Sequence, residues 1–199
     1  THHGVFDLAY LRCIPNMIIY APKDEIDLRN ILYTASLGLN HPIAIRYPRG
    51  RGKYPNYELK ITNYGFQNIE IGKAHLLKSG TKTAVLSTGF IGNNVSFAFE
   101  KISNADEIAH YDFGFVKPLD EKLLHEIFNS FDIIITIEDG AIKGGFGSGI
   151  IEFASENNYK NTIKTLGIPD DFIEHGTVEE LQQICKIDVK SLETFFSTI

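Results

Sequence analysis

The strongest constraint on the fold is an alternation of short β-branched runs with amphipathic segments. Residues 16–22 (NMIIYAP) and 41–48 (HPIAIRYP) are apolar and end in proline, and residues 24–37 between them have apolar side chains near helical spacing. A strand, a helix and a second strand within about thirty residues form a βαβ unit, which favours a parallel sheet. Asp24, directly before the helical pattern, is a typical N-cap residue.

A second, longer alternation fills the rest of the chain. Strands are expected at 82–89, 108–114, 132–140 and 162–168, and helices at 93–103, 119–131, 147–158, 177–187 and 188–199. Thr177 and Glu180 have the spacing of a capping box. This alternation predicts an open α/β domain with helices on both faces of its sheet.

The segment between the two alternations, from Arg51 to about Ser79, is rich in Gly, Tyr, Asn and Lys, with one weak strand pattern at 68–77. Its composition predicts an interdomain linker. The first unit offers only two or three strands, too few for an independent sheet. We therefore expect residues 1 to about 50 to be the end of a domain that begins upstream of residue 1.

Charge and composition exclude several classes of protein. The 199 residues carry a formal net charge of −6 with scattered basic residues, so the chain lacks the basic stripe that nucleic-acid binding requires. No apolar run approaches the roughly 20 residues needed to span a bilayer, and no signal peptide heads the chain. Cys13 and Cys185 each lie among apolar residues, which predicts buried thiols in a reducing compartment rather than a disulfide.

Two motifs and the histidines are candidate carriers of chemistry. GGFGSG (144–149) lies between a strand and a helix, where N–H groups attract anions, but it matches no nucleotide-binding pattern, and a tight packing turn is the favoured interpretation. Arg46 and Arg49 follow the carboxyl end of a strand, where either could bind a phosphate or carboxylate or form a surface ion pair. The seven histidines lack metal-ligand spacing, so no metal site is predicted. The pair His2 and His3 is too short for an affinity tag.

Segments along the whole chain resemble the 1-deoxy-D-xylulose-5-phosphate synthase family, thiamine-diphosphate enzymes of the transketolase superfamily. They are THHGVFDLAYLRCIPNM, APKDE, LYT, IAIRYPRGRG, IGKAHLLKSG, FVKPLDEKLL, EDGAIKGGFGSG and LGIPDDFIEHGTVEEL, in the family's order and spacing. The resemblance implies that residues 1–52 are the C-terminal part of a transketolase-like pyrimidine-binding domain. It implies a linker at 53–77 and, at 78–199, a transketolase C-terminal α/β/α domain with a mixed, mostly parallel sheet.

The same resemblance implies a reaction and two site residues. Pyruvate would be decarboxylated and joined to D-glyceraldehyde 3-phosphate, giving 1-deoxy-D-xylulose 5-phosphate and CO₂ for isoprenoid, thiamine and pyridoxal precursors. His2 matches the family's T-H-x-G histidine, which lies over the thiamine and contacts substrate-derived atoms. Arg49, the second Arg of RYPRG, matches the residue that binds the acceptor's phosphate. His3 receives no role.

The cofactor's ligands are expected elsewhere. In the family, the Mg²⁺-diphosphate motif, the cofactor-activating Glu and the residues that hold the pyrimidine ring precede the segment matched by Thr1. We therefore expect a missing N-terminal portion, a homodimer, and no activity from this chain alone. A bacterial cytoplasmic location is expected, with a plastid one left open.

Three alternatives remain open from the sequence. The chain could come from a 2-oxoacid dehydrogenase β subunit or a transketolase, or it could act only as a dimerisation module. Two departures from the family pattern also stand out: Gly114 where Arg is common, and Asp139-Gly140 in place of Glu-Asn. We expect these to affect local packing or dimer contacts rather than activity.

Overall fold

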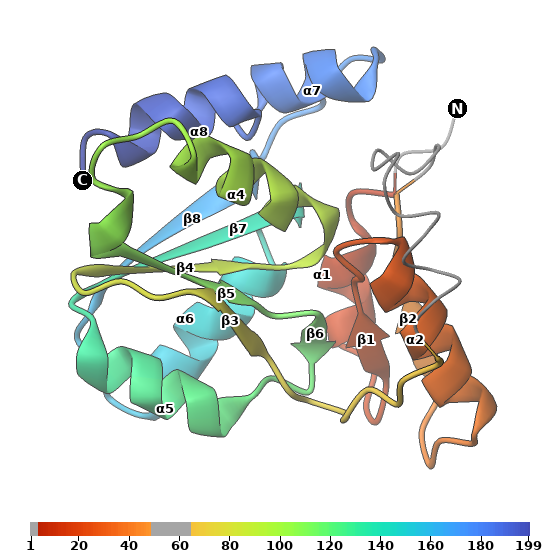
Figure 1. Ribbon diagram of the computed structural model, residues 1–199. Helices are drawn as coiled ribbons and strands as arrows, with labels where there is room; N and C mark the ends of the chain where they lie inside the picture. Colours follow the sequence, from red (N-terminus) through yellow and green to blue (C-terminus); the bar gives the residue numbers. More distant parts are fainter. Residues whose placement is uncertain (1–3, 49–64) are drawn as a thin grey trace.

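A computed structural model describes residues 4–48 and 65–199 and arranges them in two neighbouring sheets (Figure 1). In chain order the elements are α1 (Asp7–Arg12), β1 (Ile18–Tyr20), α2 (Glu25–Ser36), β2 (Ile43–Ile45), β3 (His75–Lys78), β4 (Thr83–Ser87), η1 (Gly89–Ile91), α4 (Gly92–Phe99), η2 (Ala105–Glu107), β5 (Ile108–Asp112), β6 (Phe115–Lys117), α5 (Glu121–Ser130), β7 (Ile133–Ala141), α6 (Phe146–Glu156), β8 (Thr162–Ile168), α7 (Val178–Ile184) and α8 (Val189–Phe196). The strands and helices expected from the sequence are all present, and α1, β6 and the short 3-10 helices η1 and η2 are additions.

The smaller sheet has the order β2-β1-β6, with β1 parallel to β2 and antiparallel to β6. The predicted cap of α2 is confirmed, because the Asp24 carboxylate accepts a hydrogen bond from the Asp27 N–H at 2.8 Å. Ile18 and Tyr20 of β1 and Phe115 of β6 form a small hydrophobic core beside α2. The first βαβ unit thus completes its sheet with a strand from the second half of the chain.

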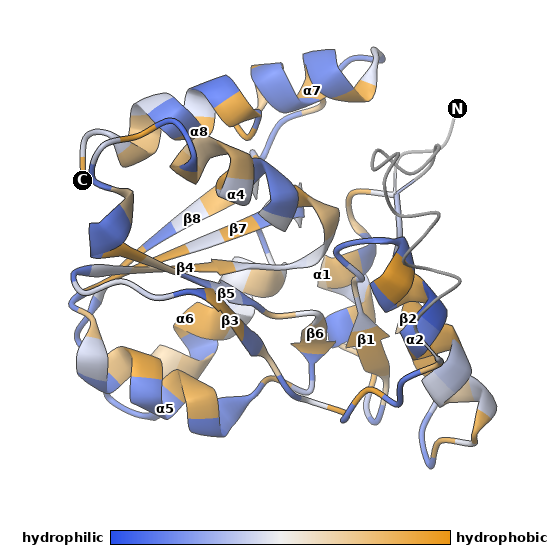
Figure 2. Cartoon of the chain, viewed as in Figure 1, coloured by the Kyte–Doolittle hydropathy of each residue, from blue (hydrophilic) through white to orange (hydrophobic). Residues whose placement is uncertain are grey.

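The larger sheet has the order β3-β5-β4-β7-β8 and is parallel except for the edge strand β3. Helices α5 and α6 cover one face and α4 and α8 the other, each over its own buried core. Hydrophobic and hydrophilic residues alternate along α5, as expected for a helix with one exposed face (Figure 2). The prediction of an α/β fold with a mixed, mostly parallel sheet is confirmed.

The thiol of Cys13 is exposed, so the prediction of a buried side chain there is wrong. The reason is the unpredicted helix α1, which buries Leu8 completely. Five residues correspond to about 140° of helix rotation, so burying Leu8 turns Cys13 away from the core. Cys185 is partly buried, and both cysteines are free.

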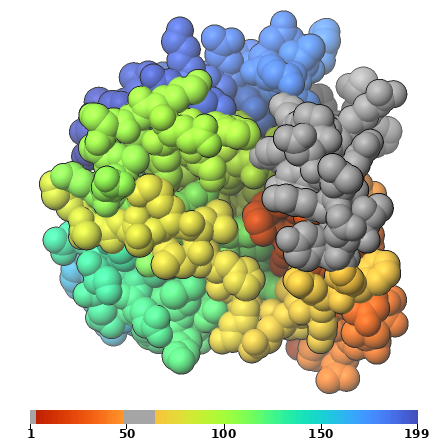
Figure 3. Space-filling view, in the orientation of Figure 1, coloured from red at the N-terminus to blue at the C-terminus, as the bar shows by residue number. Residues whose placement is uncertain are grey.

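The segment that begins at residue 65 lies against α2, as the yellow-orange and orange atoms of the space-filling view show (Figure 3). Ile69 and Ile71 pack on the core of the smaller sheet, and β3 begins at His75, within the range 53–77 expected as a linker. The domain limits at 52 and 78 remain a prediction. Among the described residues, no helix has the length and apolarity to cross a membrane.

Candidate functional site

The two residues predicted to act on substrate, His2 and Arg49, lie outside the described residues. Their described neighbours, however, meet directly. The Arg46 side chain donates a hydrogen bond from Nη2 to the carbonyl oxygen of Gly4 at 3.0 Å. Gly4 lies two positions after His2, and Arg46 lies three positions before Arg49. We take the contact between Gly4 and Arg46 as the centre of the candidate site.

Arg46 follows β2, and its guanidinium reaches the end of β7. Nη1 forms an ion pair with the Asp139 carboxylate, and Nη2 donates to the Asp139 carbonyl at 2.9 Å. Nε lies 3.4 Å from Oδ2 of Asp7 in the first turn of α1. Burial opposes the positive charge, but Asp139 and Asp7 outweigh it and raise the pKa of Arg46. The sequence left two roles open for Arg46, an anion-binding residue and a surface ion-pair partner. The structure shows an ion-pair partner, and the ion pair is mostly buried.

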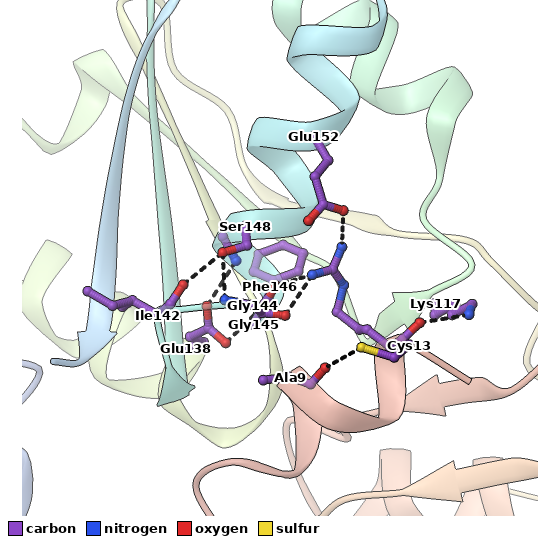
Figure 4. Close-up of polar contacts among 12 residues, drawn as sticks. Ala9, Cys13, Lys117, Glu138, Ile142, Gly144, Gly145, Phe146, Ser148 and Glu152 are labelled. Atoms are coloured by element: carbon purple, nitrogen blue, oxygen red, sulfur yellow. Dashed lines mark hydrogen bonds and ion pairs between the residues drawn. The ribbon is translucent and has the colours of Figure 1, made fainter. Parts of the chain in front are cut away.

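Glu138, at the same end of β7, is completely buried and caps helix α6 (Figure 4). Its carboxylate accepts hydrogen bonds from the N–H groups of Phe146 at 2.8 Å and Gly147 at 2.9 Å. Burial raises the pKa of Glu138 to about 7, although both bonds act in the opposite direction. Because a protein carboxylate already satisfies these N–H groups, this helix N-terminus does not offer them to a phosphate.

The glycines of GGFGSG serve close packing, in agreement with the favoured interpretation. A Cβ atom on Gly147 would lie 2.5 Å from Thr136 Oγ1 and 2.8 Å from Thr165 Cγ2, so a larger residue would push α6 away from β7 and β8. Sequence reasoning missed the role of Glu138. Its signal is a carboxylate at the end of an apolar strand, directly before a glycine-rich loop.

Helix α1 is tied to the second half of the chain by Arg12. Its guanidinium donates to the carbonyls of Gly144 at 2.6 Å and Gly145 at 3.0 Å, and pairs with Glu152 at 2.5 Å. From the other side, Lys117 Nζ donates to the Arg12 carbonyl at 2.9 Å. Figure 4 shows Gly144, Gly145, Glu152 and Lys117 around this junction.

A polar cluster lies where β1 approaches the carboxyl end of β5. Lys23 Nζ is 3.3 Å from Oδ2 of Asp112 and 3.4 Å from Oδ2 of Asp27, which also accepts from the Tyr20 hydroxyl at 3.0 Å. Burial raises the pKa of Asp112 to about 6, and the Lys23 charge counteracts it. A Cβ at Gly114 would lie 2.7 Å from the Tyr20 ring. Both departures from the family pattern, Gly114 and Asp139-Gly140, thus lie where the two halves of the chain pack together.

The described histidines are hydrogen-bonded or exposed. His110 is buried, its Nε2 is 2.8 Å from Ser87 Oγ, and burial lowers its pKa to about 4, so the ring is neutral. His125 pairs with the Tyr159 hydroxyl at 2.9 Å, and His175 is exposed. Within residues 4–48 and 65–199, no group of three or more His, Cys, Asp or Glu could hold a metal ion.

Comparison with protein families gives two matches. The family model "Transketolase, C-terminal domain" matches residues 72–192, and "Transketolase, pyrimidine binding domain" matches residues 1–54. Curated relatives are the 1-deoxy-D-xylulose-5-phosphate synthases of Parabacteroides distasonis, 50% identical over 96% of this chain, Bacteroides thetaiotaomicron, 47% over 96%, and Aquifex aeolicus, 41% over 97%. The chain spans about 30% of the length of these relatives.

Solved structures share the fold at lower identity. A structure described as "Split gene transketolase, inactive beta4 tetramer" superposes with a TM-score of 0.80 at 24% identity, over 97% of this chain and 61% of that one. The transketolase of Campylobacter jejuni superposes with a TM-score of 0.64 at 17% identity, over 100% of this chain and 28% of that one.

Proposed function

The chain belongs to the transketolase family, and we propose that it serves as the C-terminal portion of a 1-deoxy-D-xylulose-5-phosphate synthase. The reaction decarboxylates pyruvate and joins the remaining two-carbon unit to D-glyceraldehyde 3-phosphate. One observation carries the choice within the family. Curated synthases are 41–50% identical over almost the whole chain, whereas the two solved transketolase structures are 17–24% identical.

Two residues of this chain are assigned to substrate. The His2 imidazole can donate or accept a proton near neutral pH as charge develops on the substrate-derived atoms. The Arg49 guanidinium binds the phosphate of the acceptor through paired N–H donors. The contact of Arg46 with Gly4 supports this pairing, because it joins the described residues that flank His2 and Arg49.

Thiamine diphosphate, on which the family depends, would supply a carbon nucleophile for this reaction when bound. The chain spans about 30% of the length of its curated relatives, and we assign the cofactor's metal and diphosphate ligands to polypeptide outside this chain. The chain alone is then inactive. The split-gene transketolase with the same fold is likewise described as an inactive tetramer of its beta chain.

The working enzyme is a homodimer of the bacterial cytoplasm in this proposal. The curated relatives are bacterial, and apolar side chains are exposed in and around α1: Tyr10 within the helix is 60% exposed, and Phe6 before it and Ile14 after it are 50% and 40% exposed. A second copy that packs on these side chains would remove their apolar surface from water. Light scattering after size exclusion tests this, and a monomeric full-length enzyme would contradict it.

The test of function is a chimera. In the P. distasonis synthase, the 30% that this chain matches is replaced by this chain, and the parent enzyme is the positive control. With thiamine diphosphate and Mg²⁺, the chimera should form 1-deoxy-D-xylulose 5-phosphate and CO₂ from pyruvate and D-glyceraldehyde 3-phosphate, and this chain alone should form neither. If the chimera does not fold, the same exchange is made in the B. thetaiotaomicron relative.

Two outcomes would overturn the proposal. One is a folded chimera that forms no product. The other is a product pattern of a different reaction: ketol transfer between sugar phosphates for a transketolase, or acyl transfer from pyruvate for a 2-oxoacid dehydrogenase β subunit. A chain that only dimerises would also give a folded, inactive chimera.

A further inference from the structure

The Arg46 guanidinium joins three segments that are far apart in the sequence. It follows β2, contacts Gly4 and Asp7 at the start of α1, and binds both the carboxylate and the carbonyl of Asp139 at the end of β7. One side chain thus makes four polar contacts across this corner of the molecule. The relative position of the three segments therefore depends strongly on Arg46.

Arginine suits this task better than lysine does. A guanidinium has five N–H donors in a rigid plane, so Arg46 can serve two carboxylates and two carbonyls at once. A lysine ammonium has three donors at one point and cannot span the same acceptors. The Arg46 side chain is 16% exposed, and those of Asp7 and Asp139 are 18% and 22% exposed, so water screens the cluster only partly.

We propose that Arg46 is a positioning residue, which holds Gly4 and Asp7, shortly after His2 in the sequence, against the end of β2, shortly before Arg49 in the sequence. This inference rests on the proposed function of His2 and Arg49. His2 and Arg49 lie 47 positions apart, and each must meet a different part of the substrates. Small displacements of reacting groups cost large factors in rate, so a rigid tie between the segments acts directly on catalysis.

Arg12 provides a matched control. It is also an arginine that ties α1 to the second half of the chain, through two carbonyls and Glu152, and its side chain is 15% exposed. Its contacts are with the loop before α6 and with α6 itself, and not with the segment that precedes Arg49. If both arginines had a purely structural role, Arg12→Met and Arg46→Met would both lower the melting temperature and would not differ in their effect on the kinetic constants.

The experiment compares four variants of the active chimera: Arg46→Met, Arg46→Lys, Asp139→Asn and Arg12→Met. Steady-state kinetics are measured for each substrate in turn, and thermal unfolding is recorded for each variant. We expect Arg46→Met to lower kcat/KM for D-glyceraldehyde 3-phosphate about 10- to 100-fold. We expect Arg46→Lys and Asp139→Asn to be intermediate, and Arg12→Met to lower the melting temperature with KM unchanged.

Equal kinetic losses in Arg46→Met and Arg12→Met, or wild-type kinetics in Arg46→Met, would overturn the inference. If Arg46→Met does not fold, Arg46→Lys and Asp139→Asn decide by the same comparison with Arg12→Met. Failure of the proposed function itself is distinguishable, because the unmodified chimera would then form no product.

Discussion

Replacing Glu138 by Gln tests how the buried carboxylate at the start of α6 contributes to stability. The substitution keeps the shape of the side chain and removes its charge. The pKa of Glu138 is raised from 4.5 to about 7, so folding favours the protonated form. The stability from this group is therefore fully present below pH 4.5 and is lost as pH rises through 7. Between pH 5 and pH 8 the wild type should lose about 2–3 kcal/mol relative to Glu138→Gln.

Urea unfolding of the 199-residue chain at pH 5, 6, 7 and 8 measures this difference. The side-chain amide NH₂ of the Glu138→Gln variant faces the N–H of Phe146 or Gly147, and this repulsion lowers the free energy of unfolding by the same amount at all four pH values. The pH dependence of the difference is therefore unaffected. Glu156→Gln, on the exposed side of the same helix, controls for the loss of one carboxyl group. A stability difference that is the same at all four pH values would refute this reasoning, as would a Glu138→Gln variant that becomes relatively less stable as pH rises.

Two further predictions concern His110 and the ion pair of Lys23 with Asp112. Burial lowers the pKa of His110 to about 4, so the stability that this group contributes above pH 6.5 is lost as pH falls toward 4. In urea unfolding, the wild type should lose about 3 kcal/mol of stability relative to His110→Gln between pH 7 and pH 4. A stability difference that does not change with pH would contradict this. Lys23→Met leaves Asp112 buried without its cationic partner and should cost about 3 kcal/mol in the free energy of unfolding. Lys23→Met combined with Asp112→Asn should recover more than half of that loss, and no recovery would show that the pair is not coupled.

Local patterns are sufficient to predict most of the fold. The β-branched runs indicate β1, β2, β4, β7 and β8, because the composition of each suits a strand in a packed sheet. Caps such as Asp24 and Thr177 are predictable, since a cap bonds to residues two or three positions away. The glycines of 144–149 can be assigned to close packing for the same reason: a turn between a strand and a helix is a local feature.

The parts that sequence reasoning missed depend on contacts between distant residues. β6 has three residues, and its place beside β1 follows from how the two halves of the chain pack. Arg46 and Asp139 lie 93 positions apart, and no local pattern pairs them. The exposure of Cys13 was missed because α1 is only six residues long, too short for a reliable helical period.

The prediction for His2 and Arg49 depends on the family resemblance, and its most direct test is the choice of acceptor. In the chimera, kcat/KM is measured for D-glyceraldehyde 3-phosphate and for unphosphorylated D-glyceraldehyde, with and without Arg49→Met. If Arg49 binds the phosphate, the substitution should remove about 2–5 kcal/mol of preference for the phosphorylated acceptor, a fall in the ratio of at least about 30-fold. An unchanged ratio in an active Arg49→Met enzyme would contradict the assignment.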